Sequence, residues 1–253
     1  MLHKQVPLAG LAKRMDGLKV GVMSDFHAGA SATRENIFHA ISIMKAEKPE
    51  VIMLLGDFMD ADFLRTRKNI GERAYVFDAL QGLNAPLGIY AVLGNHDHYI
   101  DQGFVKKELS RIPAVVLDNQ SVSLDNGLVV AGVDDLLIGR PNPQKALKNL
   151  CQNSTVMLLS HNPNVNLHLE GEARVGLVIS GHTHGGQIRI PLLNWAPWVP
   201  GSGRYKGPSG LIRETKHRWT FITKGIGTRL APVRVACPPD VAILYLTRAK
   251  PDV

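Results

Sequence analysis

Blocks of Asp, Asn and His recur along the chain, and each lies at the end of, or just after, an apolar run that resembles a strand. The most informative block is Gly181-His182-Thr183-His184, which follows the apolar segment 175–179. The others are, in chain order, Asp25-x-His27, Gly56-Asp57-x-x-Asp60, Gly94-Asn95-His96-Asp97 and the single His161. Ligands of open α/β sheets bind beyond the carboxyl ends of the strands, so this pattern predicts a metal site at such an edge.

The spacing of apolar residues predicts a chain with both helices and strands. In residues 33–48 the apolar positions fall on one helical face, Thr33 is a suitable N-cap, and Pro49 follows the end. Further helices are expected at 71–83 and 101–111, and strands at 18–24, 51–55, 89–93, 155–159, 175–179 and 188–190. The front half therefore alternates strands and helices, while the back half is rich in strands. We expect an α/β (α+β) fold, with two packed mixed β-sheets flanked by helices.

Size and composition favour a single domain with neither a disulfide framework nor a membrane-spanning helix. The 253 residues contain no linker-like stretch, so a single domain over 1–253 is expected. Two cysteines are too few for a disulfide framework. No apolar run approaches the ~20 residues of a membrane helix, and residues 1–17 do not resemble an export signal. These features predict a cytoplasmic protein that carries neither an anchor nor an export signal.

The charge balance limits the classes of molecule that the chain is expected to bind. The formal net charge is +7, which favours phosphate, anionic lipid or nucleic acid as partners. The cations are dispersed, however, and no block of five or more is present. A specific nucleic-acid partner is therefore not expected, and a phosphate ester, either a small molecule or lipid-linked, is the expected substrate.

The residue types in the blocks define the metal chemistry. Oxygen and imidazole ligands without thiolate suit Mn, Fe, Zn, Co or Ni better than Ca, and manganese is our first choice. Seven candidate ligands are too many for one ion but suffice for two if one carboxylate bridges them. The candidates are Asp25, His27, Asp57, Asn95, His161, His182 and His184. His96 is the candidate to protonate a leaving oxygen, and Asp60 the candidate to orient His96 by a hydrogen bond.

Taken in order, these blocks resemble the calcineurin-like metallophosphoesterase superfamily, whose pattern runs D-x-H, G-D-x-x-D, G-N-H-D/E, H and G-H-x-H. The segments Gly225-Ile226-Gly227-Thr228 and Pro232-Val233-Arg234 resemble its bacterial YkuE/YaeI-type branch. The resemblance implies a four-layer sandwich and a single catalytic domain. It also implies that a hydroxide held between two ions attacks a phosphodiester or pyrophosphate in line.

The resemblance further implies a role for each block. Asp25, His27 and His184 would hold the first ion. Asn95, His161 and His182 would hold the second, with Asp57 as the bridge. His96 would be the catalytic histidine and Asp60 its partner. Two alternatives stay open: a metal-dependent nuclease, supported by the positive charge alone, and a non-catalytic interaction scaffold, which the complete ligand set argues against.

Two groups of residues outside the blocks are candidates for substrate or surface contact. Charge and position make four cations candidates for phosphate binding, namely Arg140, Arg189, Lys224 and Arg229. The loop 191–203 carries Trp195 and Trp198 directly after the last metal-type block. These indoles either pack on the core or form a hydrophobic lip that contacts a membrane peripherally.

Overall fold

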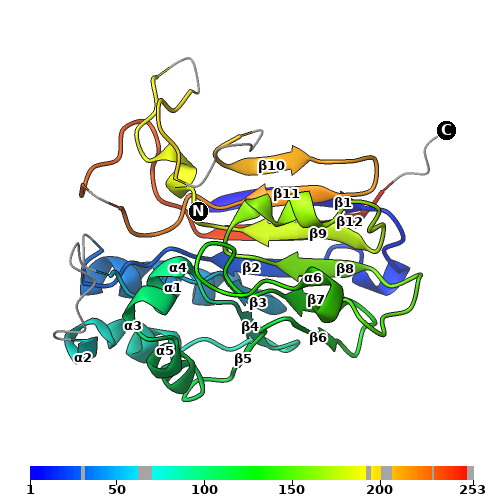
Figure 1. The fold of residues 1–253 in the computed structure, drawn as a ribbon, viewed down its shortest axis with the longest axis horizontal. Helices are drawn as coiled ribbons and strands as arrows, with labels where there is room; N and C mark the ends of the chain where they lie inside the picture. Colours follow the sequence, from blue (N-terminus) through cyan, green and yellow to red (C-terminus); the bar gives the residue numbers. More distant parts are fainter. Residues whose placement is uncertain (30–31, 62–69, 192–194, 201–206, 230, 250–253) are drawn as a thin grey trace.

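The computed structural model describes residues 1–29, 32–61, 70–191, 195–200, 207–229 and 231–249. Within these residues the strands form two six-stranded sheets that pack face to face (Figure 1). In the first sheet the order is β1 (Leu2–Leu8), β12 (Ala242–Arg248), β2 (Lys19–Met23), β3 (Val51–Leu54), β4 (Ile89–Ala91) and β5 (Ala114–Val116). In the second it is β10 (Gly210–Arg213), β11 (Trp219–Ile222), β9 (Val175–Ser180), β8 (Val156–Leu159), β7 (Val129–Gly132) and β6 (Gln120–Ser123).

Both sheets are mixed. Strands β2 to β5 run parallel, β12 is antiparallel to β2, and β1 is parallel to β12. In the second sheet β7, β8, β9 and β11 run parallel, with antiparallel strands at both edges. Parallel strands end at a common edge, so the loops after β2, β3, β4, β8 and β9 can meet there.

The helices cover the outer faces. They are α1 (Arg34–Glu47), α2 (Ile70–Arg73), α3 (Tyr75–Leu80), α4 (Asn95–Ile100), α5 (Gln102–Leu109) and α6 (Pro143–Ala146), with 3-10 turns η1 (Lys13–Met15), η2 (Pro163–His168) and η3 (His184–Gly186). Successive side chains of a strand point to opposite faces, and β3 shows the result. Val51 and Met53 lie in the core between the sheets, whereas Ile52 and Leu54 face the helices.

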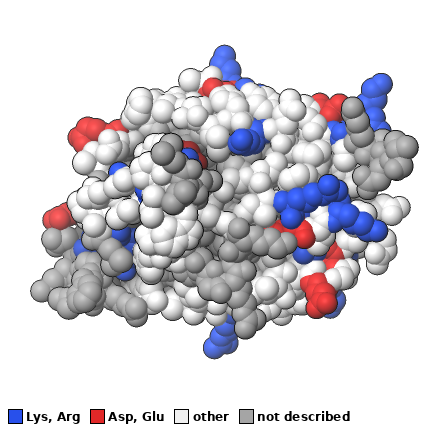
Figure 2. All heavy atoms as spheres, turned by 90° about the horizontal axis from the view of Figure 1, so that it is seen from above, with Lys and Arg blue, Asp and Glu red and all other residues white. Residues whose placement is uncertain are grey.

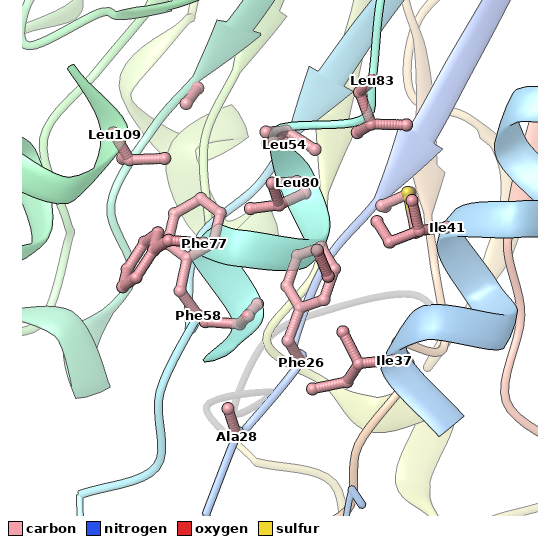
Figure 3. Close-up of a cluster of buried hydrophobic side chains, with 14 of the residues drawn as sticks. Phe26, Ala28, Ile37, Ile41, Leu54, Phe58, Phe77, Leu80, Leu83 and Leu109 are labelled. Atoms are coloured by element: carbon pink, nitrogen blue, oxygen red, sulfur yellow. The ribbon is translucent and has the colours of Figure 1, made fainter. Parts of the chain in front are cut away.

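Three apolar cores therefore separate four layers. One lies between the first sheet and α1, α3 and α5, one lies between the sheets, and a smaller one lies between the second sheet and α6 and η2. Figure 3 shows the first of these: α3 contributes Phe77 and Leu80, α1 contributes Ile37 and Ile41, and Phe26 lies between Phe77 and the α1 side chains. The expected class, two mixed sheets flanked by helices, is confirmed.

Some expected elements differ in detail. The helix predicted over 71–83 is interrupted at Ala74, which separates α2 from α3. The strand predicted at 188–190 is wrong, since Ile188 and Ile190 form only isolated bridges, to Val235 and Trp195. A strand requires several consecutive residues to pair with one neighbouring strand, whereas Ile188 and Ile190 pair with two different segments.

Candidate metal centre

Five strand ends deliver the predicted ligands to one edge of the sandwich. From the first sheet, Asp25 and His27 follow β2, Asp57 follows β3 and Asn95 opens α4 after β4. From the second sheet, His161 follows β8, while His182 and His184 follow β9. All seven side chains are buried.

The first group of ligand atoms joins both sheets. Nε2 of His27 lies 3.1 Å from Nε2 of His184, and Oδ1 of Asp25 lies 3.6 Å from the same His184 nitrogen. The candidate ligand atoms of these three residues all lie within 4.8 Å of one another. One ion can therefore be held by Asp25, His27 and His184.

The second group adjoins the first. Nε2 of His161 is 3.2 Å from Oδ2 of Asp57 and 3.1 Å from Nδ1 of His182. Oδ2 of Asp57 is also 3.5 Å from Nε2 of His27 in the first group. The same carboxylate oxygen therefore faces both groups, which is the arrangement that a bridging ligand requires.

These positions fit metal ions better than hydrogen bonds. Ligand bonds of about 2.0–2.2 Å place two atoms of one coordination shell roughly 3.0–3.5 Å apart, close to the nitrogen–nitrogen separations of 3.1 Å. In addition, Oδ1 of Asn95 is buried and has no hydrogen-bond partner among the described residues. An amide oxygen in that position costs free energy unless a cation or water satisfies it.

The site's electrostatics follow from burial and proximity. Burial opposes ionisation of Asp25 and Asp57, yet the surrounding imidazoles hold the pKa of each carboxyl below its ordinary value. Burial lowers the pKa of His182 to about 4 and that of His184 to about 3. Burial acts the same way on His161, but Asp57 overrides it and raises the pKa to about 10. The charges of the two carboxylates must be balanced, by protons on imidazole or by metal cations.

The backbone of the ligands is strained. Five of the seven have φ between 46° and 69°: Asp25, His27, Asp57, His182 and His184. Side-chain-bearing residues rarely adopt this left-handed conformation, which costs about 1–3 kcal/mol each and concentrates at functional sites. With the backbone in this conformation, both ligand side chains of Asp25-x-His27 and both of His182-x-His184 lie at the metal edge.

Aromatic anchors hold two of these loops. Phe26 lies between Asp25 and His27, and Phe58 follows Asp57. Both rings are fully buried, lie 5.6 Å apart between centroids, and point into the core beneath α1 and α3 (Figure 3). Each ligand loop is thus fixed by burial of its neighbouring ring, so the polar groups need not hold it alone.

Glycines of the blocks make close approach possible. A Cβ on Gly181 would lie 2.4 Å from Oδ2 of Asp25, and one on Gly94 would lie 2.2 Å from Oδ1 of Asp57. A Cβ on Gly225 would lie 2.6 Å from Cβ of Asp25. These glycines recur because ligand side chains occupy the space that a methyl group would need.

Asp97 fixes the bridging loop. Its carboxylate accepts hydrogen bonds from the backbone N–H groups of Asp57, Phe58 and Gly94, at 2.8 to 2.9 Å. Burial nevertheless raises the pKa of Asp97 to about 7, with Asp57 adding to the rise. Asp97 therefore joins the loop after β3 to the start of α4 and positions the proposed bridge.

His96 and Asp60 meet beside the first group. Oδ1 of Asp60 lies 3.1 Å from Nδ1 of His96, and the backbone nitrogen of Ala61 lies 3.0 Å from the same ring nitrogen, which accepts that N–H only when His96 is neutral. The same Asp60 oxygen also lies 2.9 Å from Nδ1 of His27. Asp60 is therefore shared between the two histidines, whereas the sequence pointed to His96 alone. By accepting from Nδ1–H of His27, it leaves Nε2 of that ring for a metal.

A cleft of about 270 Å³ opens over the ligands. Its lining includes Asp57, Asn95, His182 and His184 together with Tyr99, Leu137, Trp198 and Pro200. Among the described residues, only one of the four predicted phosphate-binding cations lines it, namely Arg229. Arg189 is buried and donates to the carbonyl of Gly185 and to Ser209. Arg140 is exposed and Lys224 half-buried, both outside the cleft lining.

Sequence reasoning missed the position of Arg234. Its guanidinium donates to five backbone carbonyls, those of His184, Lys224, Gly225, Gly227 and Cys237. It thereby ties the loop that carries His184 to the glycine loop that packs on Asp25 and His27. The sequence marked this stretch only through the resemblance of Gly225-Ile226-Gly227-Thr228 and Pro232-Val233-Arg234 to the family, which gave Arg234 no role.

Known proteins resemble this chain in sequence and in fold. The chain is 31% identical over 235 residues to an uncharacterized metallophosphoesterase of Aquifex aeolicus, covering 90% of this chain and 85% of that protein. It is 29% identical over 237 residues to the metallophosphoesterase YkuE of Bacillus subtilis, covering 91% and 79%. The fold is similar to a dimetal phosphatase from Danio rerio, with a TM-score of 0.55 and 13% identity over 83% of this chain and 88% of that one.

Two packed mixed sheets with carboxylates and imidazoles at a shared edge define the class as a metallophosphoesterase-like sandwich. Residues 18–186 match the calcineurin-like phosphoesterase family, and the chain belongs to that family. It is accordingly a metal-dependent phosphoester hydrolase.

Proposed function

We propose that this chain binds two divalent transition-metal ions and hydrolyses phosphodiester or pyrophosphate bonds. The observation that carries the proposal is the position of Asp57, whose Oδ2 faces His27 in one group and His161 in the other. When bound, two ions so close would activate a water molecule and neutralise charge on the phosphoryl group. The donor set suits Mn first, with Fe, Zn, Co or Ni as alternatives.

The chain's own residues would divide the remaining work. Nδ1 of His96 faces Asp60 and the Ala61 N–H, so Nε2 is the ring nitrogen that can give a proton to the leaving oxygen. Burial lowers the pKa of His96, but Asp57 and Asp60 more than offset it and the net pKa is raised. The ring is thereby suited to carry that proton near neutral pH. Arg229 would attract the substrate phosphate into the cleft.

Two alternative functions have weaker support. A nuclease would need a basic stripe for the nucleic-acid backbone. On the face drawn in Figure 2, Lys and Arg lie in separate groups with wide uncharged surface between them. A non-catalytic scaffold would not need buried, strained ligands or the His96–Asp60 contact. We therefore favour the enzyme.

The domain organisation adds one further proposal. We propose that residues 1–253 act as one catalytic domain, because β1 and β12 from opposite ends of the chain pair in one sheet. A cytoplasmic location stays a prediction.

One preparation tests the central proposal. Metal content and anomalous scattering should show two ions per chain, and activity should be measured on aryl and alkyl phosphodiesters, a monoester and a pyrophosphate. His96→Ala should retain both ions yet lose about 10²–10⁴ in turnover on alkyl esters, and less on aryl esters whose leaving group needs no proton. An equal loss on both ester types would remove His96 from proton delivery. One ion per chain, or no turnover of either diester or pyrophosphate, would refute the proposed function.

A further inference from the structure

Exposed apolar side chains gather at the mouth of the cleft. Half of the twelve large hydrophobic residues that are exposed among the described residues come from three short segments beside it. We call this group the apolar rim: Ile188, Ile190, Trp195, Trp198, Val233 and Val235. Trp195 and Trp198 are each 55% exposed, which excludes the alternative that they pack on the core. Exposed apolar groups that cluster in this way mark interaction sites, whereas isolated ones do not.

Backbone hydrogen bonds hold the rim together. Arg189 N–H donates to the Val235 carbonyl, Val235 N–H donates to Gln187, and Ile190 N–H donates to Trp195. In Figure 1 the yellow segment that carries the tryptophans and the orange segment that carries Val233 lie at the same end of the molecule. Trp198 and the exposed Leu137 also line the cleft itself. The rim is therefore one surface, continuous with the entrance to the metal centre.

The charge of these segments is of one sign. Among the described residues, 183–191, 195–200, 224–229 and 231–239 contain no Asp or Glu, while Arg229 lines the cleft and Lys224 is half-buried close to it in the chain. An apolar protein partner would be indifferent to this bias, whereas a surface with anionic headgroups above hydrocarbon would use both features. Indole rings favour such interfaces, and nearby cations add attraction to anionic lipids.

We propose that the apolar rim docks on an anionic lipid bilayer, with Trp195 and Trp198 entering the headgroup region and the cleft facing the membrane. None of the described helices is long and apolar enough to cross a membrane. The contact would be peripheral, made by irregular segments instead of an embedded helix. Resting on the proposed function, this orientation gives the substrate class: a phosphate ester whose apolar part lies in the bilayer.

Cosedimentation with vesicles tests the docking directly. The probes are vesicles of phosphatidylcholine alone and of phosphatidylcholine with about 30% phosphatidylglycerol, at low and at physiological salt. The metal-loaded full chain should bind the anionic vesicles, and more strongly at low salt. Trp195→Ala/Trp198→Ala should weaken binding at least about tenfold, because each exposed indole contributes a large apolar area. Val233→Glu, which adds an acid to the rim without removing a ring, should weaken it as well.

The matched control is Phe38→Ala/Val115→Ala, which removes exposed apolar side chains on α1 and β5, outside the rim and the cleft lining. It should bind like the unmodified chain, and thermal unfolding should show all variants folded. No sedimentation of the unmodified chain, equal binding by the rim variants, or equal binding to neutral vesicles would overturn the proposal. A dimer in solution that Val233→Glu dissociates would assign the rim to a second copy of the chain instead.

Failure of docking and failure of the proposed function are separable. Turnover of a water-soluble diester without vesicle binding would support the proposed hydrolase and refute the docking. Vesicle binding without turnover of any ester would support the docking and refute the proposed hydrolase.

Discussion

A methyl group placed at Gly94 tests whether close approach to the bridging carboxylate is needed. Gly94 is the residue before Asn95, and its φ of −103° and ψ of 177° suit any amino acid. Gly94→Ala therefore adds bulk without backbone strain, which is not true of Gly56, where φ is 90°. The new Cβ would lie 2.2 Å from Oδ1 of Asp57, 2.8 Å from its backbone nitrogen and 2.8 Å from Cε1 of His161.

None of these atoms can move away cheaply. Oδ1 of Asp57 accepts a hydrogen bond from the backbone N–H of His96, and the backbone N–H of Asp57 donates to the carboxylate of Asp97. His161 is anchored through Nδ1 to the Leu55 carbonyl at 2.7 Å. Overpacking of this kind costs about 1–3 kcal/mol of folding free energy. Displaced ligands should also lower metal affinity by about 10–100-fold, the size of effect seen when support around a metal ligand is lost.

The assay compares Gly94→Ala with Gly71→Ala, since a Cβ on Gly71 of α2 would meet no heavy atom of the described residues within 4 Å beyond its own helix and chain neighbours. Metal content after dialysis, urea unfolding and turnover should fall for Gly94→Ala and stay unchanged for Gly71→Ala. Two tightly held ions and normal turnover in Gly94→Ala would refute the steric reasoning, and with it the position of Asp57 as the bridge.

Three further predictions concern stability. Chelation should lower Tm by roughly 20 °C, because each of two ions present at about a thousand times its dissociation constant contributes about 4 kcal/mol; an unchanged Tm in calorimetry would contradict tight binding. Arg234→Met should cost about 2–4 kcal/mol by leaving carbonyls unsatisfied, whereas the exposed Arg213→Met should cost little, as urea unfolding can show. Oδ1 of Asp134 lies 2.8 Å from Nε2 of His98, and although burial opposes it, this contact holds the pKa of Asp134 at about 2. A lowered carboxyl pKa stabilises the fold fully above the ordinary value of 3.8, and this stabilisation is lost as pH falls through about 2. Asp134→Asn should therefore cost about 1 kcal/mol near pH 6 and much less near pH 2; equal losses at both pH values would contradict the linkage.

Local patterns predicted the elements that local forces determine. Helix α1 begins after Thr33, whose hydroxyl accepts the Asn36 N–H at 3.3 Å, and it buries the expected apolar face, including Ile37 and Met44. Likewise, Asp101 caps α5 by accepting from Gly103 and Phe104. Capping and helical periodicity act within a few residues, so the sequence displays them.

Other features depend on distant partners. Strand β1 has a mixed burial pattern and contains Pro7, and it exists because β12 lies beside it with Leu2 opposite Ala242. Helix α4 opens with Asn-His-Asp-His, which has no apolar face to detect, and Asp97 stabilises its start. Sequence alone does not reveal these pairings because they join segments far apart in the chain.

In the candidate site, too, some features follow from local sequence and others depend on contacts between distant segments. The seven ligands could be proposed because each follows an apolar strand, and parallel strands share an edge. The double role of Asp60, the five-carbonyl contact of Arg234 and the buried position of Arg189 arise from how loops of the two sheets meet. Charge alone made Arg189 and Arg229 look equivalent, yet only Arg229 reaches the cleft.

Each group of candidate ligands draws on both sheets, with Asp25 and His27 opposite His184, and Asp57 opposite His161 and His182. Two bound ions would therefore cross-link the sandwich at one edge, while an apolar core fills the space between the sheets farther in. Sliding of one sheet over the other would be resisted most at the metal edge. Amide hydrogens of β8 and β9 near their carboxyl ends should exchange more slowly in the metal-loaded protein, and those at the opposite ends should change little. The same residues that hold the ions would thus set which end of the molecule opens first.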